Sequence, residues 1–209
     1  MIKYTKLLIF ICLIFTSTSC IQANKVDSSK IEELNSSQAK EIFKIKKSCI
    51  LFFAGKANIM PNKVVPFVIF SEEISGEPAF VQIKSDKKIY TLRMQQLNFF
   101  DFKVNKVFVK KVTDFPYPQL IVDYYAGSAG TQGWTGQSYL YIFSWMGDKF
   151  EIILEHLIFE ENHYSYNESI KTYSYKFAEE KGLKKVIFTD QDGVKEEFVW
   201  KGQKFVKVK

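Results

Sequence analysis

Short runs of β-branched and aromatic residues recur from Ser48 to the end of the chain, at intervals of about ten residues. Gly, Asn, Asp and Pro lie between the runs and supply turn chemistry. This spacing predicts a mainly β fold, an antiparallel meander that forms a sandwich or open propeller-blade-like sheets. The runs are CILFFAG, KVVPFVIF, AFVQIK, KIYTLRM, KVFVKKV, QLIVDYY, SYLYIFSW, KFEIILEHLIF, KTYSYKF, KKVIFTD, KEEFVW and KFVKV.

One segment before these runs has helical periodicity instead. Ser29 and Glu32 have the spacing of a capping box, which marks a helix start. The apolar residues that follow fall largely on one helical face: Ile31, Leu34, Ala39, Ile42, Phe43 and Ile45. We therefore expect one amphipathic helix at about 30–46. It would pack on the β domain or, alternatively, lie on a membrane surface.

The N-terminus has the layout of a secretory signal peptide. Lys3 and Lys6 precede an unbroken apolar run at 7–15, which is too short for a permanent membrane anchor. Small and polar residues follow, and then Cys20. This arrangement resembles a bacterial lipoprotein signal, and the resemblance implies that Cys20 is the lipidated first residue of an envelope protein. With Ile21 next, it implies an outer membrane lipoprotein that faces the periplasm or the surface; cleavage after Ala23 is the alternative.

The domain organisation follows from this start. We expect a signal peptide at 1–19, a polar tether at 20–29 and a single β-rich domain at 30–209. Cys49 is then the only thiol left, so a disulfide framework is not expected. Cys49 is interpreted as a small buried apolar residue, and a Cys20–Cys49 bridge is the alternative.

The net charge of +6 is spread along the chain as lysine pairs and forms no basic run. Together with export, this argues against nucleic acid as a partner. The expected partners are the membrane, through the lipid anchor, an envelope protein and possible glycans.

An internal repeat links two hairpin-like stretches. The residues from Phe143 to Phe150 match those from Phe198 to Phe205 at a constant offset of 55, in the pattern F-x-W-x-G-x-K-F. This favours duplicated units at about 104–160 and 170–209, although the pattern also suits a common hairpin. Asp192-Gly193 predicts a further hairpin turn, of type I′.

Four glycines lie between Asp123 and Trp145, and their spacing of three fits neither a phosphate-binding loop nor a nucleophile elbow. We expect an over-long loop at 126–137 between paired strands, and this loop is the best candidate for a recognition surface. Its candidate residues are Ser128, Thr131, Gln132, Trp134, Thr135 and Gln137, and Tyr173 and Tyr175 on a neighbouring aromatic strand are added to them. Trp134 is interpreted as an exposed contact or, alternatively, as a lid on the core.

The same segment resembles secreted bacterial β-repeat proteins of the FG-GAP or blade-like type, over about residues 104–160. The resemblance rests on LIV-x-Y-x-x-G-x-x-G followed by Y-x-Y-x-F-x-W-x-G-x-x-F. Such proteins often hold calcium in an acidic turn before the first strand, where this chain has only Asp114. Asp190 and Asp192 are too few oxygen donors for calcium, so no metal or cofactor is expected.

The two histidines do not form a catalytic arrangement. Strand alternation directs His156 and Glu155 to opposite faces, and His163 lies in a polar stretch near Glu160 and Glu161. We therefore expect a binding protein and not an enzyme, with a secreted hydrolase as a remote alternative. The sequence favours an exported, lipid-anchored envelope protein that binds another protein through the exposed loop. The alternative is a glycan or cell-wall binding module that uses aromatic stacking.

Overall fold

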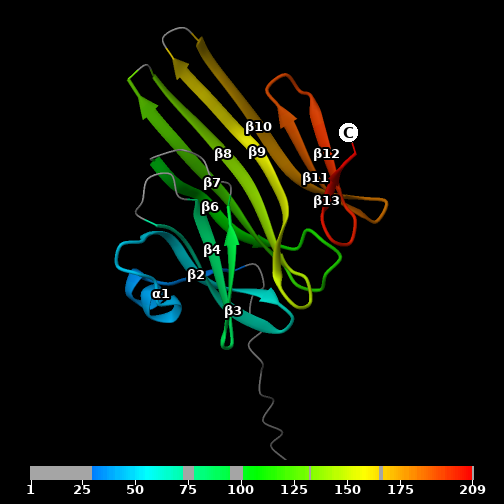
Figure 1. Cartoon of the computed structure of the whole chain (residues 1–209). Helices are drawn as coiled ribbons and strands as arrows, with labels where there is room; N and C mark the ends of the chain where they lie inside the picture. The colour runs from blue at the N-terminus through cyan, green and yellow to red at the C-terminus, as the bar shows by residue number, and fades with distance from the viewer. Residues whose placement is uncertain (1–29, 73–77, 95–100, 132, 165–166, 209) are drawn as a thin grey trace, which may run out of the picture.

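The part of the chain that the structure describes is mainly β and consists of two antiparallel sheets and one short helix (Figure 1). The computed structural model describes residues 30–72, 78–94, 101–131, 133–164 and 167–208. Each of the twelve apolar runs lies in a strand, so the predicted mainly β meander is confirmed. The expected signal peptide, Cys20 and the tether lie outside the described residues.

The smaller sheet has the order β1-β2-β3-β4-β5. Its strands are β1 (Glu32–Glu33), β2 (Ile50–Met60), β3 (Lys63–Ser71), β4 (Ala79–Ser85) and β5 (Lys88–Arg93). The single helix, α1 (Ser36–Phe43), is shorter than the segment expected at 30–46. Its capping box joins Asn35 to Gln38, whereas Glu32 lies in β1 and Ser29 is outside the described residues. The prediction of the helix start was wrong because Asn is as good an N-cap as Ser.

The larger sheet has the order β13-β12-β11-β10-β9-β8-β7-β6. Its strands are β6 (Asp101–Lys110), β7 (Gln119–Gly130), β8 (Gly133–Trp145), β9 (Phe150–Tyr164), β10 (Asn167–Glu180), β11 (Leu183–Asp190), β12 (Lys195–Trp200) and β13 (Phe205–Lys207). β10 pairs with β9 as far as Thr172, and from Tyr173 onward it pairs with β11. β10 therefore joins the two parts of the larger sheet, β6–β9 and β11–β13.

Three apolar clusters define the layers of the molecule. One lies between the small sheet and β7–β8, and includes Phe67, Ile83 and Tyr141. A second lies on the opposite face of β7–β9, where Ile121 and Leu140 pack with residues of β11–β13. The third holds α1 on the outer face of the small sheet. The larger sheet therefore folds back over itself, and β8 is buried on both faces, which fits its continuous apolar run.

The third cluster contains Cys49, which is a buried free thiol. Its interpretation as a small buried apolar residue is confirmed. The described residues contain no helix long and apolar enough to cross a lipid bilayer.

Both copies of the repeated motif end a strand in the same way. Trp145 pairs with Phe150, and Trp200 pairs with Phe205. Each pair encloses a turn whose first central residue is a glycine with positive φ, +103° at Gly147 and +81° at Gly202. This is the glycine position of a type II′ turn. The motif therefore specifies the same hairpin twice.

The turn at Asp192-Gly193 differs from the type I′ turn expected there. Only Gly193 has positive φ, and the amide of Gly193 donates to the carbonyl of Asp190. The Asp190 side chain accepts from the amides of Asp192 and Val194 at 3.0 and 2.7 Å. This aspartate-capped turn, with glycine in the bulge position, needs only one left-handed residue.

The expected loop at 126–137 was wrong. β7 and β8 stay paired without interruption from Leu120–Phe143 to Gly130–Gly133, which leaves two residues, 131 and 132, at the turn. Ser128 faces Thr135, and Ala129 faces Trp134, in this extension. β7–β10 therefore project beyond the small sheet as two long hairpins, which Figure 1 shows at the top of the molecule. We call this projecting part the arm.

Candidate functional site

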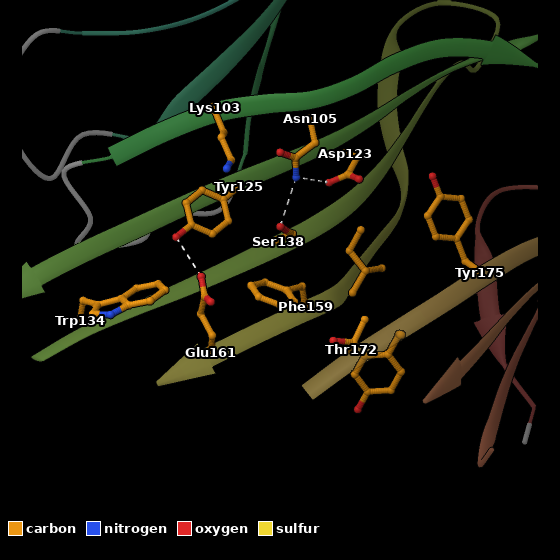
Figure 2. A pocket seen from close by; sticks show the side chains of 12 residues that line it. Lys103, Asn105, Asp123, Tyr125, Trp134, Ser138, Phe159, Glu161, Thr172 and Tyr175 are labelled. Atoms are coloured by element: carbon orange, nitrogen blue, oxygen red, sulfur yellow. Dashed lines mark hydrogen bonds between the residues drawn. The ribbon is translucent and has the colours of Figure 1, made fainter. Parts of the chain in front are cut away.

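A groove of about 530 Å³ lies where the arm meets the folded-back half of the larger sheet. It is open along one side and runs over the face of β6–β9 that carries Asp123 and Tyr125, as Figure 2 shows. Its lining combines aromatic rings with hydrogen-bonding groups from five strands. These residues are Lys103, Asn105, Asp123, Tyr125, Trp134, Ser138, Ile158, Phe159, Glu161, Thr172, Tyr173 and Tyr175.

Three polar side chains form a hydrogen-bonded group in the middle of the groove (Figure 2). The Asn105 Nδ2 donates to Asp123 Oδ1 at 3.0 Å and to Ser138 Oγ at 3.4 Å. Asn105 stands at a β-bulge, because the pairing register of β6 with β7 shifts between Val104 and Lys106. A bulge re-aims the side chain of the extra residue, here into the groove.

Asp123 is the electrostatically unusual member of this group. Burial raises the pKa of its carboxyl above the ordinary value, and the Asn105 hydrogen bond and the charge of Lys106 lower it less. None of the ion pairs between described residues involves Asp123. A half-buried carboxylate of this kind favours a ligand that brings hydrogen-bond donors or positive charge.

Tyr125 forms a fixed aromatic platform toward the end of the arm. Its hydroxyl donates to Glu161 Oε1 at 3.1 Å, and the ammonium of Lys103 lies 4.5 Å from its ring centre. Two paired glycines, Gly127 and Gly136, lie beside the ring. A Cβ on Gly136 would approach the Tyr125 hydroxyl to 2.4 Å and Glu161 Oε1 to 2.7 Å, and a Cβ on Gly127 would approach that hydroxyl to 2.7 Å. The glycines therefore make the space that the platform occupies.

Trp134 extends the aromatic surface to the end of the groove. Its indole stacks on the His163 ring of the neighbouring strand, with ring centres 4.2 Å apart and planes inclined by 13°. His163 Nε2 lies 3.8 Å from Glu161 Oε2. Because Trp134 is 39% exposed, its side chain lies at the surface and is not a lid on the core.

Tyr173 and Tyr175 close the opposite end of the groove from the second half of β10. Both are half-buried. Burial raises the pKa of the Tyr175 hydroxyl, and the negative charge of Asp123 raises it further. Tyr175 therefore lies within the electrostatic reach of Asp123 and faces the same cavity.

The structure separates the candidate residues that the sequence grouped in one loop. Trp134, Tyr173 and Tyr175 line the groove. Ser128, Thr135 and Gln137 alternate with groove positions and lie on the other face, where Thr135 Oγ1 contacts Asn162 at 2.7 Å and Gln137 Nε2 donates to Glu160 at 2.8 Å. Thr131 lies at the exposed turn, and Gln132 is outside the described residues.

The two histidines occupy different environments on β9. His156 is packed against Phe188, Phe198 and Tyr173, with its Nε2 3.8 Å from Glu196. His163 lies on the arm beside Glu161, whereas Glu160 points to the other face. No group of three His, Cys, Asp or Glu side chains that could hold a metal gathers within the described ranges.

Sequence reasoning missed most of the polar groove residues, among them Asn105, Asp123, Tyr125 and Glu161. One signal in the sequence could have identified them. Asp123 and Tyr125 are two residues apart in the apolar run QLIVDYY, so a carboxylate and a tyrosine share one face of this strand. An aspartate in a strand that is otherwise buried is a candidate site residue, because its burial needs compensation.

Comparison of the chain with protein-family models, with curated proteins and with solved structures finds no match.

Proposed function

We propose that this protein is an exported, lipid-anchored envelope protein that binds a glycan in the groove without cleaving it. The observation that carries the proposal is the lining of the groove. Flat aromatic surfaces at Trp134, Tyr125 and Tyr173 alternate along it with the hydrogen-bonding groups of Asn105, Asp123 and Glu161. A sugar ring offers an apolar face for stacking and a rim of hydroxyls for hydrogen bonds, so it matches both components.

The spacing of the groove carboxylates supports binding over hydrolysis. Asp123 lies opposite Leu140, whereas Glu161 lies opposite Gly136, four residues further along β8. At about 3.4 Å per residue, the backbone positions of Asp123 and Glu161 are about 14 Å apart along the strands. Paired carboxylates that hydrolyse a glycosidic bond stand about 5–10 Å apart.

Export is supported by the N-terminal sequence, in which two lysines, an apolar run and Cys20 follow the order of a lipoprotein signal. A lipid anchor at Cys20 would hold the domain at a membrane surface by the burial of several acyl chains. In that position the groove would meet envelope polysaccharide or peptidoglycan. Metabolic labelling with a fatty-acid analogue tests this part, since Cys20→Ala should abolish the label.

Equilibrium titration with a panel of envelope-type oligosaccharides tests the glycan proposal. Tyr125→Ala and Trp134→Ala should each weaken binding at least about tenfold, because each removes a stacking surface. Gln137→Ala is the matched control, since Gln137 lies on the same arm but on the other face. Absence of binding by the unchanged protein, or equal loss in the control, would count against the proposal.

A second candidate is a protein partner that adds a strand to the arm. Within the described part of the chain, no strand pairs with the outer edge of β10 before Tyr173, and Ile170 on this edge is 50% exposed. Open edges of this kind accept extended segments of other proteins. Ile170→Lys should then prevent co-purification of an envelope protein that the Gln137→Ala variant retains, and retention by Ile170→Lys would argue against it.

A further inference from the structure

The middle of the groove combines one carboxylate with neutral donors and aromatic rings. Asp123 accepts a hydrogen bond from Asn105 on one oxygen, and Ser138 shares the same amide group. Thr172, Tyr173 and Tyr175 of β10 also line the groove. A carboxylate offers about four lone-pair positions, so one amide donor leaves most of its accepting capacity for a ligand.

The described lysines near Asp123 do not form an ion pair with its carboxylate. Lys106 is the cationic side chain whose charge acts on Asp123, yet its ammonium lies 5.0 Å from the ring centre of Phe108. Lys103 is placed over Tyr125. Neither lysine forms an ion pair with Asp123 among the described residues. Lys106 faces Asp123 across the paired strands and acts on it by its charge, but this half-buried carboxylate forms no ion pair among the described residues. A bound cation could therefore pair with it directly.

We propose that this part of the groove selects glycans that carry a free, protonated amine, with Asp123 as its acceptor and the aromatic ring of Tyr175 in the same lining. The inference rests on the proposed glycan-binding function and names the class of sugar. A hydrogen bond from an ammonium to a carboxylate is about twice as strong as a neutral one, and aromatic faces attract cations. An N-acetylated sugar offers only a neutral amide here, so it forms no ion pair with the carboxylate.

The middle of the groove and its arm end therefore differ in what they recognise. At the arm end, Glu161 already accepts the Tyr125 hydroxyl and lies beside His163, so this carboxylate has partners of its own. Stacking on Tyr125 and Trp134 at that end is independent of the amine. In this proposal Asp123 determines the selectivity for the amine, and the stacking surfaces of the arm provide the general affinity for sugar rings.

The test compares two ligands that differ only in the amine: a trimer of glucosamine and the same trimer with each amine acetylated. Titration of the exported protein, at a pH where the amine is protonated, should give about tenfold tighter binding of the free-amine trimer. Asp123→Asn keeps the size of the side chain and an acceptor for Asn105, so it should remove the preference, and the two trimers should then bind with equal affinity. Glu161→Gln is the control and should retain the preference.

A second measurement on the unchanged protein does not depend on the fold of a variant. The preference for the free amine should shrink as salt concentration rises, because salt screens the ionic contribution and leaves stacking intact. Equal affinity for the two trimers, a preference that survives Asp123→Asn, or a preference insensitive to salt would overturn the inference while glycan binding stands. If neither trimer nor any other oligosaccharide binds, the proposed function fails, and this inference fails with it.

Discussion

At the scale of single residues, the glycines of the arm have two distinct roles. Gly130 and Gly133 flank the turn, whereas Gly127 and Gly136 face each other in the middle of the paired strands. The second pair has no positive φ, so backbone freedom does not explain it. Its role is steric, because the ring of Tyr125 and the carboxylate of Glu161 occupy the space that side chains would fill.

Gly136→Ala should therefore disturb the groove more than the fold. The new methyl group must displace Tyr125 and Glu161, which breaks the 3.1 Å hydrogen bond between them. We expect a loss of about 1–3 kcal/mol in the free energy of unfolding and at least about tenfold weaker oligosaccharide binding. Denaturant unfolding and calorimetric titration measure the two effects.

Ser128→Ala is the control for that variant, since Ser128 lies on the same arm but on the opposite face. It should change neither quantity appreciably. If Gly136→Ala bound oligosaccharide as well as the unchanged protein does, Tyr125 would not be the platform described here.

His156 gives a prediction on pH dependence. Burial lowers the pKa of its imidazole below the ordinary value of 6.5, Glu196 opposes this shift, and Lys207 adds to it. Because the unfolded chain then takes up the proton more readily than the folded protein, stability should fall as the pH drops below about 6.5. His156→Phe should remove this part of the slope, as measured by denaturant unfolding between pH 5 and about 7.5.

The raised pKa values of Asp123 and Glu155 have the opposite effect on stability at lower pH. The folded state binds protons at these carboxyls more readily than the unfolded chain does, so they favour the folded state as the pH falls. The difference between the unchanged protein and His156→Phe isolates the histidine from these carboxyls. An identical slope in the two proteins would show that burial of His156 does not govern the acid response.

At the scale of elements, the two copies of the W-x-G motif form equivalent turns at the ends of β8 and β12. In each case the middle strand of a three-stranded meander ends at the tryptophan, β7–β8–β9 in the first and β11–β12–β13 in the second. Both glycines hold a positive φ that a side chain would strain.

Gly147→Ala and Gly202→Ala should therefore each destabilise the protein, by about 1–3 kcal/mol. Nothing lies within 4 Å of a Cβ at either position, so the backbone conformation alone is being tested. Thermal or denaturant unfolding measures the effect. Equal stability of either variant and the unchanged protein would mean that the turn relaxes to another type without cost.

The same scale shows what could be predicted from the sequence. The strands with an alternating or continuous apolar pattern were predicted because burial of their faces fixes that pattern, as in KVVPFVIF and SYLYIFSW. The strands of the arm were not predicted between residues 126 and 137. This part projects beyond the layers and carries polar residues on both faces, so the alternation of apolar and polar residues that marks a strand is lost. Glycine and hydroxyl residues were then interpreted as a loop, and the groove residues on the same strands were missed with it.

At the scale of the whole molecule, the groove exists because the larger sheet folds back over itself. β10 contributes Thr172 to the arm and Tyr173 and Tyr175 to the folded-back half, so a single strand joins the two sides of the groove. The apolar clusters that hold the layers together are complete without the end of the arm. The apolar clusters and the end of the arm, the proposed stacking surface, therefore lie in different parts of the molecule.

Shortening the arm tests this division. Deletion of 128–130 together with 133–135 brings the paired Gly127 and Gly136 to the two-residue turn and preserves the register of the rest of β7 and β8. The variant should fold with a free energy of unfolding within about 1 kcal/mol of the original, because the residues removed lie outside the apolar clusters. It should bind oligosaccharide poorly, since Trp134 is lost. Cooperative unfolding and titration measure both, and a shortened protein that still bound normally would place recognition elsewhere.

The most direct test of glycan binding in the groove uses the three tryptophans of the chain. Trp134 is exposed in the groove, whereas Trp145 and Trp200 are buried in two different apolar clusters. Their indole N–H groups give separate signals in a nitrogen–proton correlation spectrum, which is recorded during titration with the glucosamine trimer. The structure predicts that the Trp134 signal shifts in a saturable manner while the signals of Trp145 and Trp200 stay in place. A Trp134 signal that remains unmoved at saturating trimer would contradict the assignment of the groove as the binding site.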